Sequence, residues 1–267
     1  MICDSLASRF LAAQAIATQA GRLARRFLDN PEKLGVKLKG PQDFVSAADL
    51  AVERLVIDRV AAAFPDDAIY GEESAAATGV GPADWLWVVD PIDGTANFVR
   101  GRADWCVSIA VLHAGVPEIG VICDPTATEL FAGWRGHGAT RNGVPIVASS
   151  CGTLSGATIS LDHSSRSSAS EHLAHARAIL EQGGEYRRSG SAALSLAHVA
   201  DGRLDGFVEL HLSAWDVLAG IVLVNEAGGW TSDFLRGDGL NAGNPMIASA
   251  PLLRDALLAA TNLGAWR

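Results

Sequence analysis

Hydrophobic residues at the start of the chain recur every three or four positions. The repeat follows Ser5 and consists of Leu6, Phe10, Ala13, Ala17, Gly21, Ala24 and Leu28. This spacing predicts one long amphipathic helix, with Ser5 as its N-cap and Pro31 closing it. A second helix is expected over residues 47–64, with Pro65 after its end.

Shorter apolar runs follow, and they are typical of strands. In the first half they cover residues 68–70, 85–89, 106–113, 118–123 and 129–134, of which the last three form a meander. Near residue 145 the pattern changes, and strands then alternate with helices. The expected strands are 157–161, 205–210 and 245–249, and the expected helices are 169–182, 191–201, 214–227 and 251–261.

These patterns predict an α/β protein of two subdomains. Residues 1–145 are expected to form an α+β subdomain with an antiparallel sheet, and residues 146–267 an α/β subdomain. The chain has 267 residues, of which 49% are hydrophobic. This composition supports a large core and excludes intrinsic disorder.

The charge balance limits the partners. Lys and Arg number 21 and Asp and Glu number 30, which gives a net charge of −9. An acidic chain argues against nucleic-acid binding, which favours a basic face. It does not argue against an anionic substrate, because clustered carboxylates can recruit divalent cations that supply the attraction.

Features of a membrane or secreted protein are not predicted. No apolar run reaches about 18 residues, and the N-terminus lacks the pattern of a secretory leader. The four cysteines are far apart and form no C-x-x-C pair. We therefore expect a cytoplasmic protein with neither a membrane nor a nucleic acid as partner.

Acidic residues cluster where predicted strands end. Glu72 and Glu73 follow the strand 68–70, and Asp90 and Asp93 follow the strand 85–89. The Pro-Ile turn between the two aspartates can aim both carboxylates and the Ile92 carbonyl at one point, a donor set that suits Mg²⁺. The alternative is structural, because Asp-Pro and Asp-Gly are common turn dipeptides.

Gly94 and Thr95 favour the functional interpretation. They resemble a helix start, whose backbone N–H groups can receive a phosphate. The chain has neither a P-loop, nor a cysteine-phosphatase loop, nor a G-x-S-x-G motif. A metal-activated water is therefore the simplest nucleophile.

Asp216 is the candidate ligand from the second half. It follows Trp215 in the opening turn of a predicted helix. There it either stabilises the helix dipole or serves as a metal ligand that is distant in sequence.

Taken together, these motifs resemble the inositol monophosphatase family of Mg²⁺-dependent, lithium-sensitive phosphatases. The resemblance covers nearly the whole chain and rests on separate motifs that occur in the right order. They are Lys39 with Asp43–Asp49, Gly71-Glu72-Glu73, the run Asp90–Phe98, Gly190–Leu194, Gly202–Gly206 with Glu209, and Trp215-Asp216. The fold that the resemblance implies is the layered αβαβα sugar-phosphatase fold.

The resemblance also implies the metal ligands. Glu72, Asp90 and the Ile92 carbonyl would hold one Mg²⁺. Asp90, Asp93 and Asp216 would hold a second, and a third, weaker ion would involve Glu72.

Catalytic and substrate-binding roles are implied at further positions. Thr95 and Asp49 would orient the attacking water, with Glu72 as a third catalytic residue. The amides of Gly94 and Thr95 would hold the phosphate. The alcohol part of the substrate would lie against Gly190, Ser191, Ala192, Glu209 and Asp216.

The expected activity is Mg²⁺-dependent hydrolysis of a small polyol or sugar-like phosphate. Myo-inositol 1-phosphate is the first expectation, and a homodimer is the expected assembly. Histidinol phosphate, fructose bisphosphate and 3′-phosphoadenosine phosphate remain alternatives, because enzymes of this superfamily share the metal ligands. A regulatory binding protein that keeps the fold is the alternative of another class.

Overall fold

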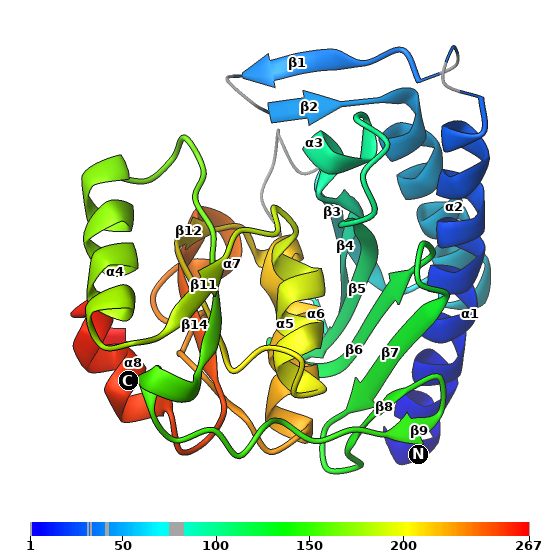
Figure 1. The fold of residues 1–267 in the computed structure, drawn as a ribbon. Helices are drawn as coiled ribbons and strands as arrows, with labels where there is room; N and C mark the ends of the chain where they lie inside the picture. Colours follow the sequence, from blue (N-terminus) through cyan, green and yellow to red (C-terminus); the bar gives the residue numbers. More distant parts are fainter. Residues whose placement is uncertain (1, 31, 33, 41–42, 75–82, 267) are drawn as a thin grey trace.

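The protein has a layered αβαβα architecture. The computed structural model describes residues 2–30, 32, 34–40, 43–74 and 83–266. Figure 1 shows helices on the outer face of one sheet, two helices between this sheet and a second one, and further helices on the far face of the second sheet. The predicted fold class is confirmed.

The first sheet has seven strands in the order β3-β4-β5-β6-β7-β8-β9. Their bounds are β3 Ala68–Gly71, β4 Trp85–Asp93, β5 Cys106–His113, β6 Val116–Asp124, β7 Glu129–Trp134, β8 Ala139–Arg141 and β9 Val144–Pro145. All neighbours pair antiparallel except β3 and β4, which are parallel. This agrees with the expected antiparallel sheet apart from that one pair.

The second sheet has five strands in the order β11-β10-β12-β14-β13. Their bounds are β10 Thr158–Leu161, β11 Glu185–Arg187, β12 Gly206–Leu212, β13 Trp230–Thr231 and β14 Asn244–Ser249. β10 is parallel to β11 and β12, whereas β14 is antiparallel to β12 and β13. The sheet is mixed because β14, the last strand in the chain, runs antiparallel between β12 and β13.

The helices form the other three layers. The outer pair on the first sheet is α1 Ile2–Leu28 and α2 Ala47–Ala63; the central pair is α5 Ala192–Ala200 and α6 Ala214–Glu226; the outer pair on the second sheet is α4 Ala169–Glu181 and α8 Arg254–Thr261. Short helical segments are α3 Thr95–Phe98, η3 Leu154–Gly156, α7 Gly239–Ala242 and η4 Gly264–Trp266.

Alternating side chains on β4 show how the first sheet separates two cores. Leu86 and Val88 point into the central core with α5 and α6, whereas Trp87 and Val89 point into the outer core with α1 and α2. Strand periodicity produces this division, since successive side chains lie on opposite faces. The central core contains side chains from both sides of residue 145, and the subdomain boundary there stays a prediction.

The two central helices are apolar on all sides. Eight of the nine residues of α5 and nine of the thirteen residues of α6 are buried. A helix that is hydrophobic all round requires burial on every face, and a position between two sheets provides it. Their N-terminal ends are therefore fixed in place, which matters for the site described below.

Several short elements differ from the predicted pattern. The elements that are not predicted are the hairpin of β1 (Lys37–Gly40) and β2 (Asp43–Val45), the short strands β8, β9, β11 and β13, and α7. These elements have two to four residues each, which is too short for a hydrophobic period to be visible. The predicted helix 251–261 begins only at Arg254, because residues 251–253 form a turn.

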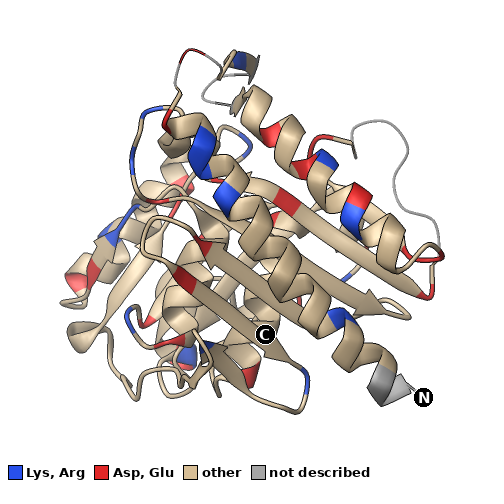
Figure 2. Ribbon diagram, turned by 90° about the vertical axis from the view of Figure 1, so that its right-hand side faces the viewer, with Lys and Arg blue, Asp and Glu red and all other residues tan. Residues whose placement is uncertain are grey.

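No helix among the described residues is long and apolar enough to cross a membrane. Figure 2, which looks onto the side that α1 and α2 cover, shows basic and acidic residues interspersed on the helices without a basic face.

Candidate active site

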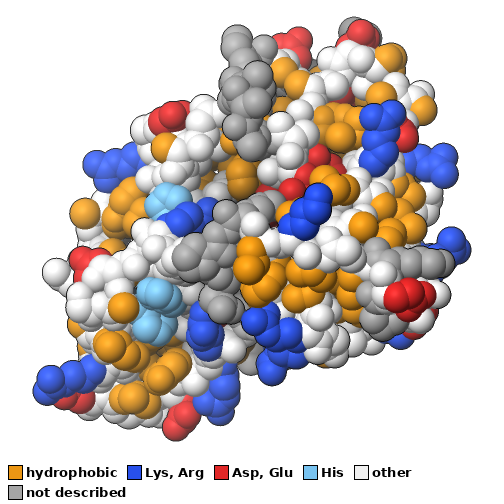
Figure 3. Space-filling model, turned by 90° about the horizontal axis from the view of Figure 1, so that it is seen from above, with side chains coloured by type: hydrophobic (Ala, Val, Ile, Leu, Met, Phe, Trp, Pro, Cys, Tyr) orange, Lys and Arg blue, Asp and Glu red, His pale blue; other side chains and the backbone are white. Residues whose placement is uncertain are grey.

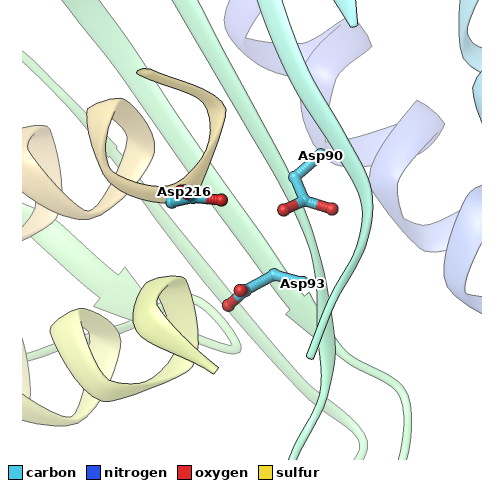
Figure 4. A group of neighbouring side chains, drawn as sticks. All are labelled: Asp90, Asp93 and Asp216. Carbon is cyan, nitrogen blue, oxygen red and sulfur yellow. The ribbon is translucent and has the colours of Figure 1, made fainter. Parts of the chain in front are cut away.

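Three carboxylates lie together where β4 meets α6. Asp90 and Asp93 belong to the end of β4, and Asp216 lies in the first turn of α6. One ligand oxygen from each lies within 4.8 Å of the others, and Figure 4 shows the three side chains pointing toward one another. Asp90, Asp93 and Asp216 are only 2%, 7% and 8% exposed. We refer to these three residues as the carboxylate cluster.

The turn at the end of β4 is held by its own side chains. The Ile92 N–H donates to Asp90 Oδ1 at 3.0 Å, and Thr95 Oγ1 donates to the Ile92 carbonyl at 2.9 Å. The pairing of β4 with β5 shifts its register between Asp90 and Asp93. In a regular strand these aspartates would point to opposite faces, so the irregularity allows both to reach the cluster.

Gly94 follows with a left-handed backbone, at a φ of 93°. A Cβ at this position would lie 2.8 Å from the Asp104 carbonyl oxygen and 3.2 Å from that of Gly190. Both the dihedral angle and the lack of space therefore require glycine. This contact brings two predicted segments of the site together, around Gly94 and around Gly190.

The N-terminal end of α5 holds Asp93. Its Oδ2 accepts hydrogen bonds from Ser191 Oγ and from the Ala193 N–H, the latter at 2.8 Å, and its Oδ1 accepts from the Ala192 N–H at 3.3 Å. The Cys106 thiol donates to the same carboxylate at 3.7 Å. A helix N-terminus stabilises a negative charge, so α5 fixes the direction of the Asp93 side chain, and its hydrogen bonds oppose the rise in pKa that burial causes.

Asp216 is held by its own helix and faces a cation. The Ser213 N–H donates to Asp216 Oδ2 at 2.7 Å, which ties the side chain to the start of α6. The Arg166 guanidinium lies 3.8 Å from the same oxygen and donates to Ser213 Oγ at 3.0 Å. Arg166 is half-exposed, so its charge reaches Asp216 from the solvent side.

Burial and mutual repulsion destabilise the ionised form of the carboxylate cluster. Burial, and next the charge of Glu72, raises the pKa of Asp90 well above its ordinary value. Burial, followed by the charge of Asp216, raises the pKa of Asp93 to about 7, and burial also raises the pKa of Asp216. Three carboxylates this close need either protons or a counter-ion. Their hard oxygen atoms fit a divalent cation such as Mg²⁺.

A carboxylate and a hydroxyl pair up next to the turn. Thr95 Oγ1 lies 3.2 Å from Asp49 Oδ1, although 46 positions separate the two residues. Ser46, the N-cap of α2, donates to Asp49 Oδ2 from its N–H at 2.8 Å and from its hydroxyl at 2.6 Å. Burial raises the pKa of Asp49, and the Ser46 hydrogen bonds oppose this rise. The helix cap thus presents an oriented carboxylate to Thr95.

The other predicted site residues lie around the cluster. Glu72 follows β3, its N–H donates to the Val89 carbonyl at 3.1 Å, and its charge acts on Asp90. It lies outside the 4.8 Å group that the described residues form. Glu209 is buried on β12, where burial and then the charge of Asp162 raise its pKa well above its ordinary value.

The Gly190 N–H, which could have donated to a substrate, is already hydrogen-bonded within the protein. It donates to Asp162 Oδ1 at 2.9 Å. Ser191 and Ala192, which were expected on the alcohol side, both donate to Asp93. These donors serve the carboxylate cluster, and the substrate-binding role of the segment stays a prediction.

Three residues that the sequence analysis does not single out take part in this arrangement. Asp162 anchors Gly190, Arg166 faces Asp216, and Glu53 Oε2 accepts the Glu73 N–H at 2.8 Å. Glu53 has one available signal, since it lies four positions after Asp49 on the same face of a helix. Asp162 and Arg166 follow a strand end, but nothing in the local pattern separates them from surface residues.

Figure 3, which views the molecule from above, shows acidic side chains near the middle of the face, with hydrophobic side chains and basic (Lys or Arg) side chains beside them. A substrate that approaches this face therefore meets both signs of charge.

A layered α/β fold with a buried cluster of oxygen ligands defines the class as an α/β protein with a candidate divalent-cation site. The model of the inositol monophosphatase family matches residues 6–263, and the chain belongs to this family.

Named relatives agree with this assignment. Nus factor SuhB of Escherichia coli K12 is 38% identical over 251 residues, which cover 90% of this chain and 94% of the relative. The crystal structure of the extragenic suppressor protein suhB from Bartonella henselae has a TM-score of 0.85 and 34% identity, and covers 95% of this chain and 98% of that one. The inositol monophosphatase from Anabaena (Nostoc) has a TM-score of 0.82 and 34% identity, with 97% of each chain covered.

Proposed function

We propose that the protein is a Mg²⁺-dependent phosphomonoesterase that acts on a small polyol phosphate, with myo-inositol 1-phosphate as the first candidate. The observation that carries the proposal is the convergence of Asp90, Asp93 and Asp216 within 4.8 Å in a buried position. Membership of the inositol monophosphatase family supports the reaction class.

The ligands of the metal ions are proposed from this cluster. Asp90 with the Ile92 carbonyl and Glu72 would hold one ion, and Asp90, Asp93 and Asp216 a second, while a third ion at Glu72 is the weakest expectation. The cluster provides only oxygen atoms, and its burial leaves three negative charges that cations compensate. Bound Mg²⁺ supplies Lewis acidity and lowers the pKa of water.

Thr95 and Asp49 are proposed to orient the attacking water. The Thr95 hydroxyl has one proton, and two acceptors lie within reach, the Ile92 carbonyl at 2.9 Å and Asp49 at 3.2 Å. When the carbonyl is otherwise engaged, the proton goes to Asp49 and the lone pairs of Oγ1 can accept a hydrogen bond from water. Asp49 is held by Ser46, so this pair keeps its direction.

Phosphate and alcohol would be bound by different parts of the chain. The N–H groups of Gly94 and Thr95 lie at the start of α3, and the first amides of a helix lack an acceptor within it. Such amides bind phosphate oxygens. On the alcohol side of the site, the Glu209 carboxylate is suited to accept hydrogen bonds from substrate hydroxyl groups. This favours a polyol as the leaving group.

A phosphate-release panel tests the proposal. Purified protein is assayed with inositol, histidinol, fructose and nucleotide phosphates, with Mg²⁺ and with excess chelator. The proposal expects chelator-sensitive release that is fastest for myo-inositol 1-phosphate. Faster release from another phosphate would keep the reaction class and replace the substrate.

A regulatory binding role is the second candidate, and the relatives named Nus factor SuhB support it. A folded protein that binds Mg²⁺ and releases no phosphate from any member of the panel would favour this role. We propose with the enzyme role that the protein is a cytoplasmic homodimer and that lithium inhibits it. Sedimentation tests the homodimer, and rate measurements in Li⁺ test the inhibition.

A further inference from the structure

Asp162 is a buried carboxylate that the proposed reaction does not use. It directly follows β10 at the end of the second sheet, is 5% exposed, and does not belong to the carboxylate cluster. Its oxygens accept hydrogen bonds from the Gly190 N–H at 2.9 Å, Ser160 Oγ at 2.8 Å and Ser189 Oγ at 3.2 Å. A buried carboxylate is tolerated when donors of this kind surround it.

Two of these three donors belong to the loop that precedes α5. Ser189 and Gly190 lead directly into Ser191, whose hydroxyl donates to Asp93. From the other side, Asn97 Nδ2 donates to the Ser189 carbonyl at 2.8 Å. The loop is therefore held between α3 of the first half and Asp162 of the second.

A cluster of three serines, Ser160, Ser189 and Ser195, connects Asp162 to α5 through hydrogen bonds. Ser195, one turn into the helix, forms hydrogen bonds with Ser189 Oγ and, at 3.1 Å, with Ser160 Oγ. Ser195 Oγ also donates to the Ser191 carbonyl at 2.8 Å. Every member of this cluster is tied either to Asp162 or to the first turn of α5.

We infer that Asp162 is a positioning residue, which fixes the loop of residues 189–191 and thereby aims the start of α5 at Asp93 and at the alcohol side of the site. The inference rests on the proposed function. Asp162 itself touches neither the cluster nor, in this account, the substrate. It acts through the Gly190 amide and the Ser189 hydroxyl.

Two substitutions distinguish positioning from general stability. Asp162→Ala removes all three acceptor contacts. Asp162→Asn keeps an oxygen for the Gly190 N–H, and the two serine hydroxyls can turn to accept from its amide. The control is Asp205→Ala, because Asp205 accepts from the Thr158 N–H at 2.8 Å and from Ser149 Oγ at the opposite end of the same sheet.

Each variant is compared with the wild type in three measurements: KM and kcat with myo-inositol 1-phosphate, Mg²⁺ affinity by calorimetry, and Tm. We expect Asp162→Ala to raise KM and weaken Mg²⁺ binding by about tenfold each, with a smaller loss of kcat. Asp162→Asn should restore both values to within about threefold of wild type. Asp205→Ala should lower Tm and leave KM and Mg²⁺ affinity unchanged.

Equal KM and Mg²⁺ affinity in Asp162→Ala and the wild type would overturn the inference, as would the same changes in Asp205→Ala. If Asp162→Ala does not fold, Asp162→Ser replaces it, since serine is too short to bridge all three donors. A wild-type protein without phosphatase activity would refute the proposed function, and the Mg²⁺ affinities would still decide the role of Asp162.

Discussion

The two sides of the carboxylate cluster are built in different ways. On the Asp90 side, the contacts are local: Ile92 bonds to Asp90, and Thr95 bonds to Ile92, within one turn. On the Asp93 side, the donors come from Ser191, Ala192 and Ala193, about 100 positions away. The first side can form wherever the turn forms, whereas the second exists only when α5 is packed between the sheets.

This difference separates two kinds of sensitivity. Changes on the local side alter one or two hydrogen bonds and leave the packing intact. Changes on the assembled side disturb a buried carboxylate whose hydrogen-bond donors come from the start of α5. We therefore expect the assembled side to be the less tolerant of the two.

Asp93→Asn gives the largest expected effect. It removes the charge of a proposed metal ligand on the assembled side, and the amide nitrogen cannot accept hydrogen bonds from the α5 donors. The variant should nearly abolish turnover and keep the wild-type fold, as judged from kcat at saturating Mg²⁺ and from circular dichroism.

Asp124→Asn is the matched control for this variant. Asp124 is also a buried aspartate at a strand end, where it accepts from the Thr126 and Ala127 N–H groups, and asparagine can keep an oxygen there. A residual Asp93→Asn rate above about a tenth of wild type would mean a loss below about 1.4 kcal/mol and would contradict the ligand assignment.

Thr95→Ala tests the local side and should have the next largest effect. The backbone amide remains, and only the hydroxyl that links Ile92 to Asp49 is lost. We expect kcat to fall by about 100-fold with little change in KM, because the hydroxyl is proposed to orient the attacking water. Thr95→Ser should recover most of the rate, and an effect confined to KM would assign Thr95 to substrate binding instead.

Gly94→Ala probes the point where the two sides touch. The new Cβ would lie 2.8 Å from the Asp104 carbonyl in a backbone of positive φ. We expect a loss of about 1–3 kcal/mol in the free energy of unfolding, measured with denaturant. Gly101→Ala is the control, because Gly101 also has a positive φ and its Cβ would meet nothing within 4 Å. An equal loss in both variants would show that backbone strain, and not the contact between the two sides, sets the cost.

The contrast between local contacts and contacts formed by distant segments explains what could be predicted from the sequence. The long helices and the strands β4 to β7 have clear periods, and the Asp90–Thr95 turn is contiguous, so local chemistry suffices for them. The contacts of Asp162 and Arg166 depend on how β10, α5 and α6 pack, and no short-range pattern encodes them. For the same reason Ser191 is predicted near the substrate, while in the structure its hydroxyl donates to Asp93. The short strands β8 and β13 show no hydrophobic period, and they form only because a neighbouring strand is present.

The smallest expected effect is the pH dependence of stability without metal. Burial, followed by the charge of Asp216, raises the pKa of Asp93 to about 7, and Asp90 and Asp216 shift in the same direction. Between about pH 4 and pH 7 the folded protein therefore binds more protons than the unfolded chain, so its stability falls as the pH rises. In chelator, Tm should be lower at pH 8 than at pH 5, by at least about 2–4 °C, which corresponds to about 1 kcal/mol at this chain length.

Mg²⁺ should reverse the trend, because it competes with protons for the same oxygens and stabilises the form that binds it. The Tm increase on adding Mg²⁺ is therefore expected to be larger at pH 8 than at pH 5. In chelator, Asp93→Asn should reduce the change of Tm with pH. Asp124→Asn should keep the part of this change that the carboxylate cluster causes. A Tm that rises with pH in chelator would show that ionising these carboxylates does not destabilise the fold. A Mg²⁺ effect that is equal at both pH values would show that they are not the main Mg²⁺ ligands.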